Sequence, residues 1–311
     1  MLPVTLTCSD ASRLREEPML ATASRVERWI LVEQCGPWGA DAVPLARVDD
    51  ALSRHLVSSA NERGARLVLL RHPVGVDCPP GRTVFLADSR PGRETLLRRH
   101  FDADGELLAT PLPAGDPAPD GWQPVDGPLL LVCTHGKHDR CCALRGRPVA
   151  EALARRYPDR TWESSHVGGD RFAANAVVLP QGWYLGRLEA TGAADVVARL
   201  QQGRLPLPHL RGRSSLPLPV QAAQHFARTQ LDRDGTDDLA LVEQRGAGAD
   251  AWVVRLGGAR HLPDVEVRVR YDRRATEPAL LTCHALRESV APQFQLEGLT
   301  TLVRRGRPHA G

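Results

Sequence analysis

Residues 128–142 read PLLLVCTHGKHDRCC, which places cysteines and histidines between an apolar run and a helical pattern. The apolar run at 128–132 is typical of a buried strand, and residues 143–156 have helical periodicity. A second loop, residues 166–170 (HVGGD), leads into a strand predicted over 172–179, and its two glycines let the backbone pass close to another group. Thiolates on one loop, with an imidazole and a carboxylate on the other, predict a metal or cluster site in a small α/β unit.

Length, charge and cysteine content limit the class of protein. A chain of 311 residues has room for two or three domains. Its net charge is only +3 and its arginines are spread along the chain, so we expect no nucleic-acid binding. It has no apolar run long enough to cross a membrane, and its first residues lack the apolar core of a signal peptide, so we expect a soluble cytoplasmic protein. Seven cysteines, an odd number, favour ligation or burial over a disulfide framework in a reducing compartment.

The N-terminal part, residues 1–125, has the pattern of a βαβ beginning. Residues 104–126 are crowded with Pro, Gly and Asp and predict a connector, which ends this unit. The strands are predicted at 28–34, 66–71 and 82–87, and the helices at 45–63 and 93–100.

The middle part, residues 126–204, predicts a thioredoxin-like half-fold with a cysteine where its first strand ends. Residues 205–219 contain four prolines and predict a semi-rigid linker, and residues 220–311 predict a small α+β module. The fold class is therefore α/β, with an N-terminal thioredoxin-like half, a central thioredoxin-like unit and the C-terminal module. The remaining elements are predicted as strands at 128–133, 161–164, 172–179, 182–188, 251–256 and 265–271, and as helices at 143–156, 193–202 and 220–231.

Two motifs resemble the sucrase/ferredoxin-like family. CTHGKHDRCC (133–142) and WESSHVGGDRFAANAVVLPQGWYLGR (162–187) carry the resemblance, and RWILVEQCGPWG (28–39) and QAAQHF (221–226) are similar to its flanking regions. The resemblance implies a thioredoxin-like ferredoxin domain that holds a 2Fe-2S cluster with two cysteines and two histidines, the histidines four residues apart around a Gly-Gly pair.

On that pattern Cys133 and Cys142 are the thiolate ligands and His166 is the first histidine. Asp170 stands where the family has its second histidine, which makes it the candidate fourth ligand. A carboxylate suits iron less well than a thiolate or an imidazole. Asp170 is therefore also open to a different interpretation, as an ion-pair partner of a neighbouring arginine or an acceptor of a loop amide.

Further residues of the two loops could take the place of Asp170. If Asp170 is not a ligand, His135, His138 or Cys141 must replace it; Cys141 is otherwise a packing residue or a spare ligand. Cys133-Thr134-His135 has the spacing of half a Rieske site, but no Cys-x-x-His supplies the other half. Zinc also takes Cys and His ligands, although the usual Cys-x-x-Cys pairs are absent.

Residues around the loops are candidates for cofactor contacts. Arg140 and Arg171 flank the loops, and they either form a solvated surface or dock an acidic partner and donate hydrogen bonds towards the cluster sulfurs. Asn175 and Glu163 are expected to hold the ligand loops. The cysteines distant from the motif are expected to be packing residues or free thiols: Cys8, Cys35, Cys78 and Cys283.

The resemblance implies one-electron transfer through a 2Fe-2S cluster. It favours an electron carrier over an enzyme. The chain has neither a Gly-x-Gly-x-x-Gly fingerprint nor a P-loop, so we expect a separate redox partner protein to supply or accept electrons. No localised pair of carboxylates predicts a glycosidase, and no sucrase activity is expected. Two rival hypotheses are a thiol-dependent reductase or peroxidase that uses Cys141 and Cys142, and an interaction module stabilised by zinc.

Overall fold

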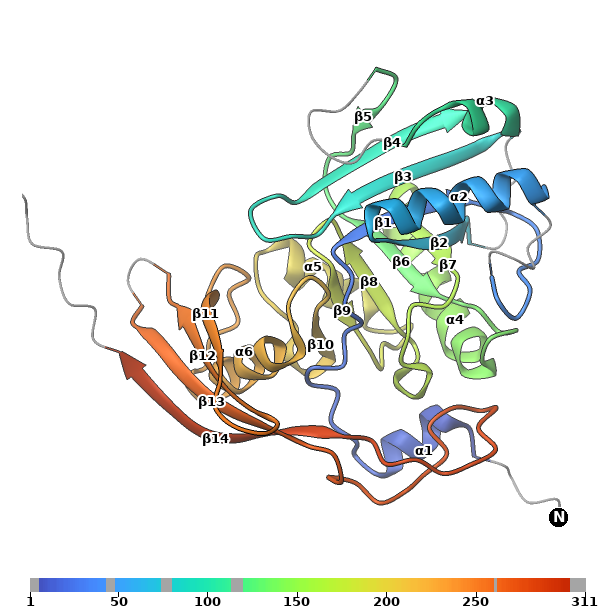
Figure 1. Ribbon diagram of the computed structural model, residues 1–311. Coiled ribbons are helices and arrows are strands. Elements are labelled where there is room, and N and C mark those ends of the chain that lie inside the picture. Colours follow the sequence, from blue (N-terminus) through green and yellow to red (C-terminus); the bar gives the residue numbers. More distant parts are fainter. Residues whose placement is uncertain (1–5, 43–47, 74–79, 113–119, 260–261, 303–311) are drawn as a thin grey trace, which may run out of the picture.

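The alternating strands and helices build one large mixed sheet. A computed structural model describes residues 6–42, 48–73, 80–112, 120–259 and 262–302, and within them this sheet has ten strands. In order across the sheet (Figure 1) they are β10 (Leu210–Arg213), β9 (Trp183–Leu185), β8 (Ala176–Leu179), β6 (Leu129–Cys133), β7 (Thr161–Ser164), β2 (Ala65–Arg71), β1 (Arg28–Glu33), β3 (Arg82–Asp88), β4 (Thr95–Phe101) and β5 (Gln123–Pro124).

Two copies of one four-strand arrangement make up most of this sheet. In the first, β1 and β2 are parallel and joined by α2 (Asp50–Arg63), β3 is antiparallel to β1, β4 is antiparallel to β3, and α3 (Asp104–Ala109) follows. In the second, β6, α4 (Arg140–Arg156), β7, β8, β9 and α5 (Ala193–Gln201) repeat the same order and directions. Each is a thioredoxin-like half, which confirms the predicted fold class.

The two halves are joined edge to edge by the second strand of each. β2 and β7 are antiparallel and pair at two positions, Leu70 with Ser164 and Arg71 with Glu163, and the Ser165 N–H extends the join by donating to the Leu69 carbonyl at 2.8 Å. Arg71 also forms an ion pair with Glu163 at 2.7 Å, and the Glu163 side chain is fully buried. The first half therefore pairs with β7, the strand beside β6, which ends at Cys133.

The large sheet curls around a shared core. α2 covers one face of the first half, over Ile30, Val32 and Leu69, while α4 and α5 cover one face of the second half. The opposite faces of both halves contribute to one cluster, in which Trp29 of β1 lies 6.3 Å from Tyr184 of β9, centroid to centroid. Because four strands separate β1 from β9 across the sheet, this contact requires strong curvature.

A second, smaller sheet forms the C-terminal module. It is antiparallel, in the order β11 (Ala240–Gly246), β12 (Ala251–Gly257), β13 (Asp264–Asp272) and β14 (Gln293–Leu302), and α6 (Leu218–Leu231) packs on it (Figure 1). The segment between β13 and β14 leaves the sheet and returns to the N-terminal helix α1 (Cys8–Leu14). α1 and the β13–β14 segment thus both pack against the start of α4 in the second half.

Two sequence predictions are wrong for segments of the large sheet. Residues 93–100 were predicted to be helical but lie largely in β4, because Leu96 and Leu97 are both buried and the segment pairs along its whole length with β3. Residues 205–219 are not a linker: they supply β10, which pairs with β9, and Leu205, Leu210, Arg211 and Leu216 are buried.

Several other predictions are shifted or only partly covered. The predicted connector at 104–126 contains α3 and β5, and its residues 113–119 lie outside the described residues, as does part of the predicted start of α2. Short 3-10 turns occur at Pro158–Arg160, Asp170–Phe172 and Leu207–His209. The predicted boundary between the first two units, at residues 125–126, stays a prediction. The strands on either side of it belong to one continuous sheet.

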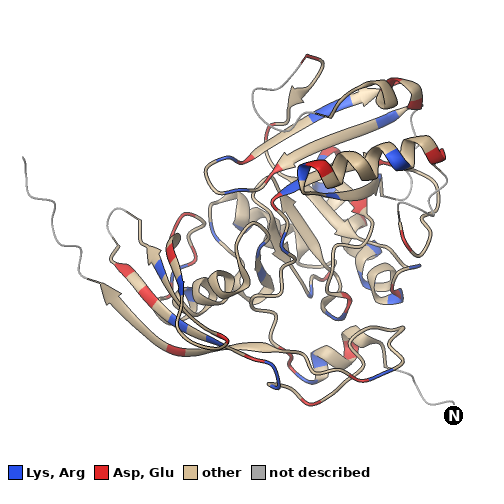
Figure 2. Cartoon of the chain, in the orientation of Figure 1, with Lys and Arg blue, Asp and Glu red and all other residues tan. Residues whose placement is uncertain are grey.

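Charged residues are distributed along the chain without a strong bias (Figure 2). Figure 2 shows basic and acidic residues interspersed along the chain. Among the described residues, no helix is both long enough and apolar enough to span a membrane.

Candidate metal centre

The predicted ligands come together where β6 ends and α4 begins. Cys133 is the last residue of β6, and Cys142 lies in the first turn of α4, whose N-cap is Asp139. Ligand atoms of Cys133, Cys142 and His166 all lie within 4.8 Å of one another. Both cysteines are 1% exposed, so the thiols form the buried side of the group.

Close packing of α4 on β6 makes this approach possible. Gly146 lies one turn after Cys142 on the same face of α4, because residues four apart share a helix face. A Cβ at Gly146 would overlap the carbonyl oxygen of Cys133 and lie 3.1 Å from its carbonyl carbon. The absence of a side chain at this position lets the first turn of α4 come down on the end of β6.

The second loop brings a histidine and a carboxylate to the thiols. Gly168 and Gly169 have φ of +102° and +83°, a backbone conformation that side chains disfavour, and they turn the chain between His166 and Asp170. Oδ1 of Asp170 lies 3.0 Å from Nδ1 of His166 and accepts a hydrogen bond from the Cys142 thiol at 3.2 Å. Asp170, 6% exposed, therefore lies inside the group that the sequence predicted.

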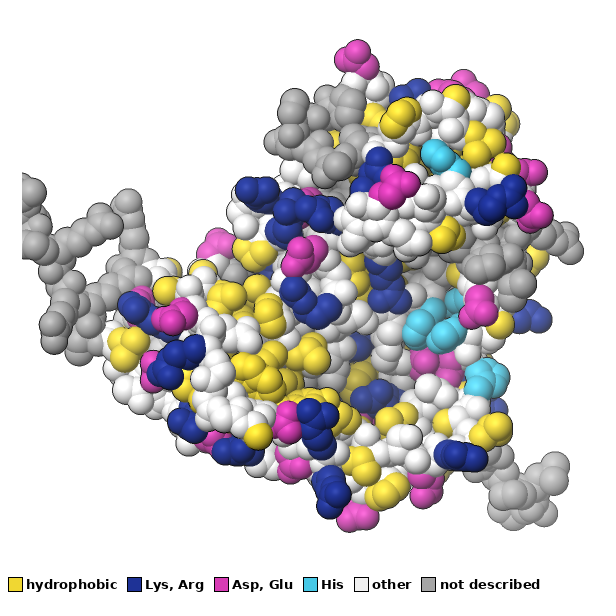
Figure 3. Space-filling view, viewed as in Figure 1, with side chains coloured by type: hydrophobic (Ala, Val, Ile, Leu, Met, Phe, Trp, Pro, Cys, Tyr) yellow, Lys and Arg dark blue, Asp and Glu magenta, His cyan; other side chains and the backbone are white. Residues whose placement is uncertain are grey.

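His138 is a further member of this group. Its ring stacks on that of His166 with centroids 3.7 Å apart, and its Nε2 lies 3.9 Å from Oδ2 of Asp170. Ligand atoms of His138, His166 and Asp170 also lie within 4.8 Å of one another. The His138 side chain is 37% exposed against 22% for His166, so the group opens to the surface on its histidine side. Figure 3 shows histidine side chains at the surface on the face it presents.

His135 and Cys141, which the sequence allowed as substitutes for Asp170, are engaged elsewhere. Nε2 of His135 lies 2.6 Å from the Gly39 carbonyl oxygen, and its Nδ1 accepts from the His166 backbone N–H at 3.3 Å. His135 therefore orients the second loop. The Cys141 thiol points away from Cys142 and lies among Cys8, Cys283 and Asp139.

The protonation states of the group are strongly coupled. A hydrogen bond from Cys142 lowers the pKa of Cys133 well below its ordinary value, and the same contact, with burial, raises the pKa of Cys142. Burial lowers the pKa of His166, but Asp170 and Cys133 outweigh it and raise the pKa to about 9. Burial raises the pKa of Asp170, but His166 and Cys142 outweigh it and lower the pKa. The site thus favours a thiolate and a carboxylate beside a cationic imidazole.

Residues behind the loops hold them in place. Glu163 accepts a hydrogen bond from Thr134 at 2.9 Å, next to Cys133, as well as from Arg71. Asn175 donates to the Gly169 carbonyl at 2.8 Å, and its own backbone carbonyl accepts from the Cys133 N–H at 3.0 Å. Both residues were predicted to support the ligand loops, and these contacts fit that interpretation.

Arg211 is a supporting residue that the sequence did not indicate. It is 2% exposed and donates to the carbonyls of Gly168 and Thr22, to Oγ1 of Thr22 and to Oδ1 of Asn175 at 2.6–3.1 Å. Among the described residues, no carboxylate oxygen lies within 4.0 Å of its guanidinium. Burial lowers its pKa to about 10, although Asp170 and Cys133 act in the opposite direction. A buried cation behind the ligand loops suits an anionic site.

The two predicted arginine contacts differ in their surroundings. Arg171 pairs with Glu17 at 2.6 Å and its guanidinium lies over the Phe172 ring. Arg140 is exposed, and interaction with the Cys283 thiol raises its pKa. A role for either residue in cofactor binding stays a prediction.

A family model described as sucrase/ferredoxin-like matches residues 19–212, which include both halves of the large sheet apart from the last residue of β10. The chain belongs to the sucrase/ferredoxin-like family. The family predicted from the two motifs is thereby confirmed.

Solved structures and curated proteins add little to this assignment. Two similar structures are cysteine-to-serine variants of the thioredoxin-like 2Fe-2S ferredoxin from Aquifex aeolicus; each has 17% identity and a TM-score of 0.23, over 27% of this chain and 96% of that chain. No curated protein matches the chain.

The ligand group of this family member fits an iron-sulfur centre in its chemistry. It offers two buried cysteines, of which Cys133 has a strongly lowered pKa, and a mostly buried imidazole, His166, whose Nδ1 lies 3.0 Å from Oδ1 of Asp170. Thiolate and imidazole are the ligands that iron-sulfur clusters take. The residues present could therefore hold a metal or a cluster.

Proposed function

We propose that the chain is a one-electron carrier whose 2Fe-2S cluster is held by Cys133, Cys142, His166 and Asp170. The observation that supports this most is the meeting of the two cysteines, from a strand end and a helix start, with His166 and Asp170 from the Gly-Gly loop. When bound, such a cluster supplies one-electron redox chemistry.

The surrounding residues would give the carrier its properties. The thiol side is buried and keeps water from the sulfurs, while the partly exposed histidine side gives a partner protein a short approach to the centre. Arg211, together with the backbone N–H groups in the first turn of α4, stabilises negative charge on the ligands. We expect a separate reductase or acceptor protein to dock on this histidine side.

One observation weighs against the rival reductase or peroxidase. A dithiol mechanism requires Cys141 and Cys142 to act on each other or on one substrate. Their thiols instead lie in different groups, since Cys142 contacts Asp170 while Cys141 contacts Cys8 and Cys283. The neighbouring cysteines therefore serve separate sites.

The test is an ultraviolet-visible spectrum of anaerobically purified protein, with iron and acid-labile sulfide measured on the same sample. Wild type should show charge-transfer bands and two irons and two sulfides per chain. A colourless protein without iron would refute the proposal and leave zinc or bare thiols.

Adjacent variants provide the matched control. Cys142→Ala should lose most of its iron because it removes a ligand, whereas Cys141→Ala should keep its iron because that thiol points elsewhere. Loss of iron in Cys141→Ala, with retention in Cys142→Ala, would show that the wrong neighbour has been assigned.

A further inference from the structure

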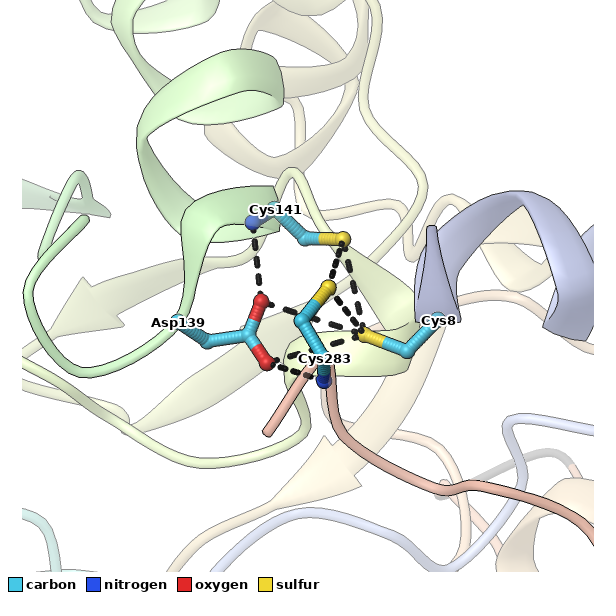
Figure 4. Close-up of side chains that lie close together, drawn as sticks. All are labelled: Cys8, Asp139, Cys141 and Cys283. Carbon is cyan, nitrogen blue, oxygen red and sulfur yellow. Dashed lines mark hydrogen bonds between the residues drawn. The ribbon is translucent and has the colours of Figure 1, made fainter. Parts of the chain in front are cut away.

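A second group of soft ligands lies outside the site described above. Cys8 begins α1, Cys141 lies in the first turn of α4, and Cys283 lies in the segment between β13 and β14. Figure 4 shows their side chains converging with that of Asp139. The first and last cysteines are 275 residues apart in the sequence, so only the tertiary fold brings them together.

The three sulfurs form a nearly equilateral triangle. Sγ of Cys141 lies 3.4 Å from Sγ of Cys8 and 3.3 Å from Sγ of Cys283, and the third side measures 3.6 Å. The two oxygens of Asp139 lie 3.9 and 3.8 Å from the Cys8 sulfur. One ligand atom from each of the four residues falls within 4.8 Å of all the others.

These separations approach those of a tetrahedral zinc site. With Zn–S bonds of about 2.3 Å, sulfurs at the corners of a tetrahedron lie about 3.8 Å apart, and an oxygen bound at about 2.0 Å lies about 3.5 Å from each sulfur. The sulfur–sulfur distances are within about 0.5 Å of that value, and the Asp139–Cys8 distances are within about 0.4 Å of theirs.

A disulfide does not account for the group. A sulfur–sulfur bond needs about 2.05 Å, and pairing any two of these cysteines would leave the third alone. The triangle favours no pair, since its sides differ by only a few tenths of an ångström. A single central ion explains the equal spacing, whereas a disulfide predicts one short side.

Burial and hydrogen bonding have already arranged the four residues. Asp139 is fully buried, and its two carboxylate oxygens accept from the backbone N–H groups of Cys141 at 2.8 Å and Cys283 at 2.7 Å. Cys8 and Cys141 are 5% and 0% exposed. Each carboxylate oxygen that accepts one N–H retains a further lone pair for a metal.

We propose that Cys8, Cys141, Cys283 and Asp139 bind one zinc ion. Binding replaces the thiol protons by zinc and releases them to solvent, so no oxidant or reductant is needed. The ion ties α1 and the β13–β14 segment to the first turn of α4. That turn also carries Cys142, so the two sites take ligands from one turn of α4.

Metal analysis of the full chain, purified without chelator, tests the proposal. We expect one zinc per chain, independent of iron content. Cys8→Ser and Cys283→Ser should lose zinc while keeping iron and visible absorption, and Cys142→Ser should lose iron while keeping zinc. Wild type without zinc, or zinc lost from Cys142→Ser but kept by Cys8→Ser, would overturn the proposal.

Two further measurements remain decisive if a serine variant does not fold. In wild type, Cys8, Cys141 and Cys283 should resist alkylation until a zinc chelator is added, which peptide mass spectrometry can measure. Labelling of these cysteines without chelator would overturn the proposal. So would a disulfide between two of them. Asp139→Asn retains a good helix N-cap. It should bind zinc at least tenfold more weakly, and unchanged affinity would exclude Asp139 as a ligand.

Discussion

Replacing Gly146 by alanine tests how the first site is built. In an exposed helix this change is stabilising by about 1 kcal/mol, because alanine has the higher helix propensity. Here the new methyl group would lie 3.1 Å from the Cys133 carbonyl carbon and would overlap its oxygen. Since an ordinary carbon–carbon contact is about 3.5–4.0 Å, the carbon alone would make α4 retreat by about 0.4–0.9 Å, and the nearer oxygen requires a larger shift.

The expected effect is a loss of stability and of iron. Overpacking of this kind costs about 1–3 kcal/mol, which outweighs the gain in helix propensity over most of that range. The unfolding midpoint should fall by roughly 1–2 °C for each kcal/mol of net loss in a chain of this length. Because Cys142 would move away from Cys133, iron content after anaerobic purification should fall as well.

Gly105→Ala is the matched control. Gly105 lies in α3, and a Cβ there would meet nothing within 4 Å. This variant should be as stable as wild type or more stable, with full iron content, in the same thermal melt and iron assay. A Gly146→Ala protein that behaves like Gly105→Ala would refute the claim that this close contact positions Cys142.

Three more predictions concern single side chains. Asp170→Ala should shift the electron paramagnetic resonance g-values or shed iron, and His138→Ala should do neither; the opposite pattern would make His138 the fourth ligand. Arg211→Met should lower the free energy of unfolding by roughly 2–5 kcal/mol in a urea titration, because buried acceptors lose their donor; an unchanged midpoint would contradict this. Burial lowers the pKa of His225, so the unfolded chain binds a proton more readily and stability falls as pH drops below 6.5. Urea midpoints from about pH 7 to about pH 5 should fall less steeply in His225→Gln than in wild type, and equal slopes would assign the pH dependence to other groups.

Much of the first site could be predicted because its ligands lie at the ends of strands. An apolar run that stops at Cys133 fixes where that thiol must be, and the Gly-Gly pair marks a second loop. The order of strands and helices then indicates a thioredoxin-like half. His138 could be predicted only as a substitute ligand, because sequence spacing does not reveal that its ring stacks on His166.

The errors have physical causes that single segments do not reveal. In Thr95–Phe101, Leu96, Leu97 and Phe101 are spaced as on a helix face, and only pairing with β3 makes the segment a strand. Arg211 lies in a proline-rich stretch that resembles a linker, although the fold buries it. Cys8 and Cys283 were predicted to be packing residues or free thiols; they do pack, but against Cys141 and Asp139, a contact that no local pattern encodes. For Cys35 the prediction is wrong, because this residue is exposed and forms a disulfide; Cys78 lies outside the described residues.

The join between β2 and β7 has a consequence for motion within the sheet. Six residue pairs hold β1 to β2 and four hold β6 to β7, but β2 and β7 pair at two positions, with hydrogen bonds between Leu69 and Ser165 beside them. Short ladders with few backbone hydrogen bonds open at lower free energy than the strands around them. Amide hydrogens at this join should therefore exchange with solvent before those that pair β1 with β2. The Arg71–Glu163 pair spans the join, so each opening would separate Arg71 from the carboxylate that also accepts a hydrogen bond from Thr134, beside Cys133.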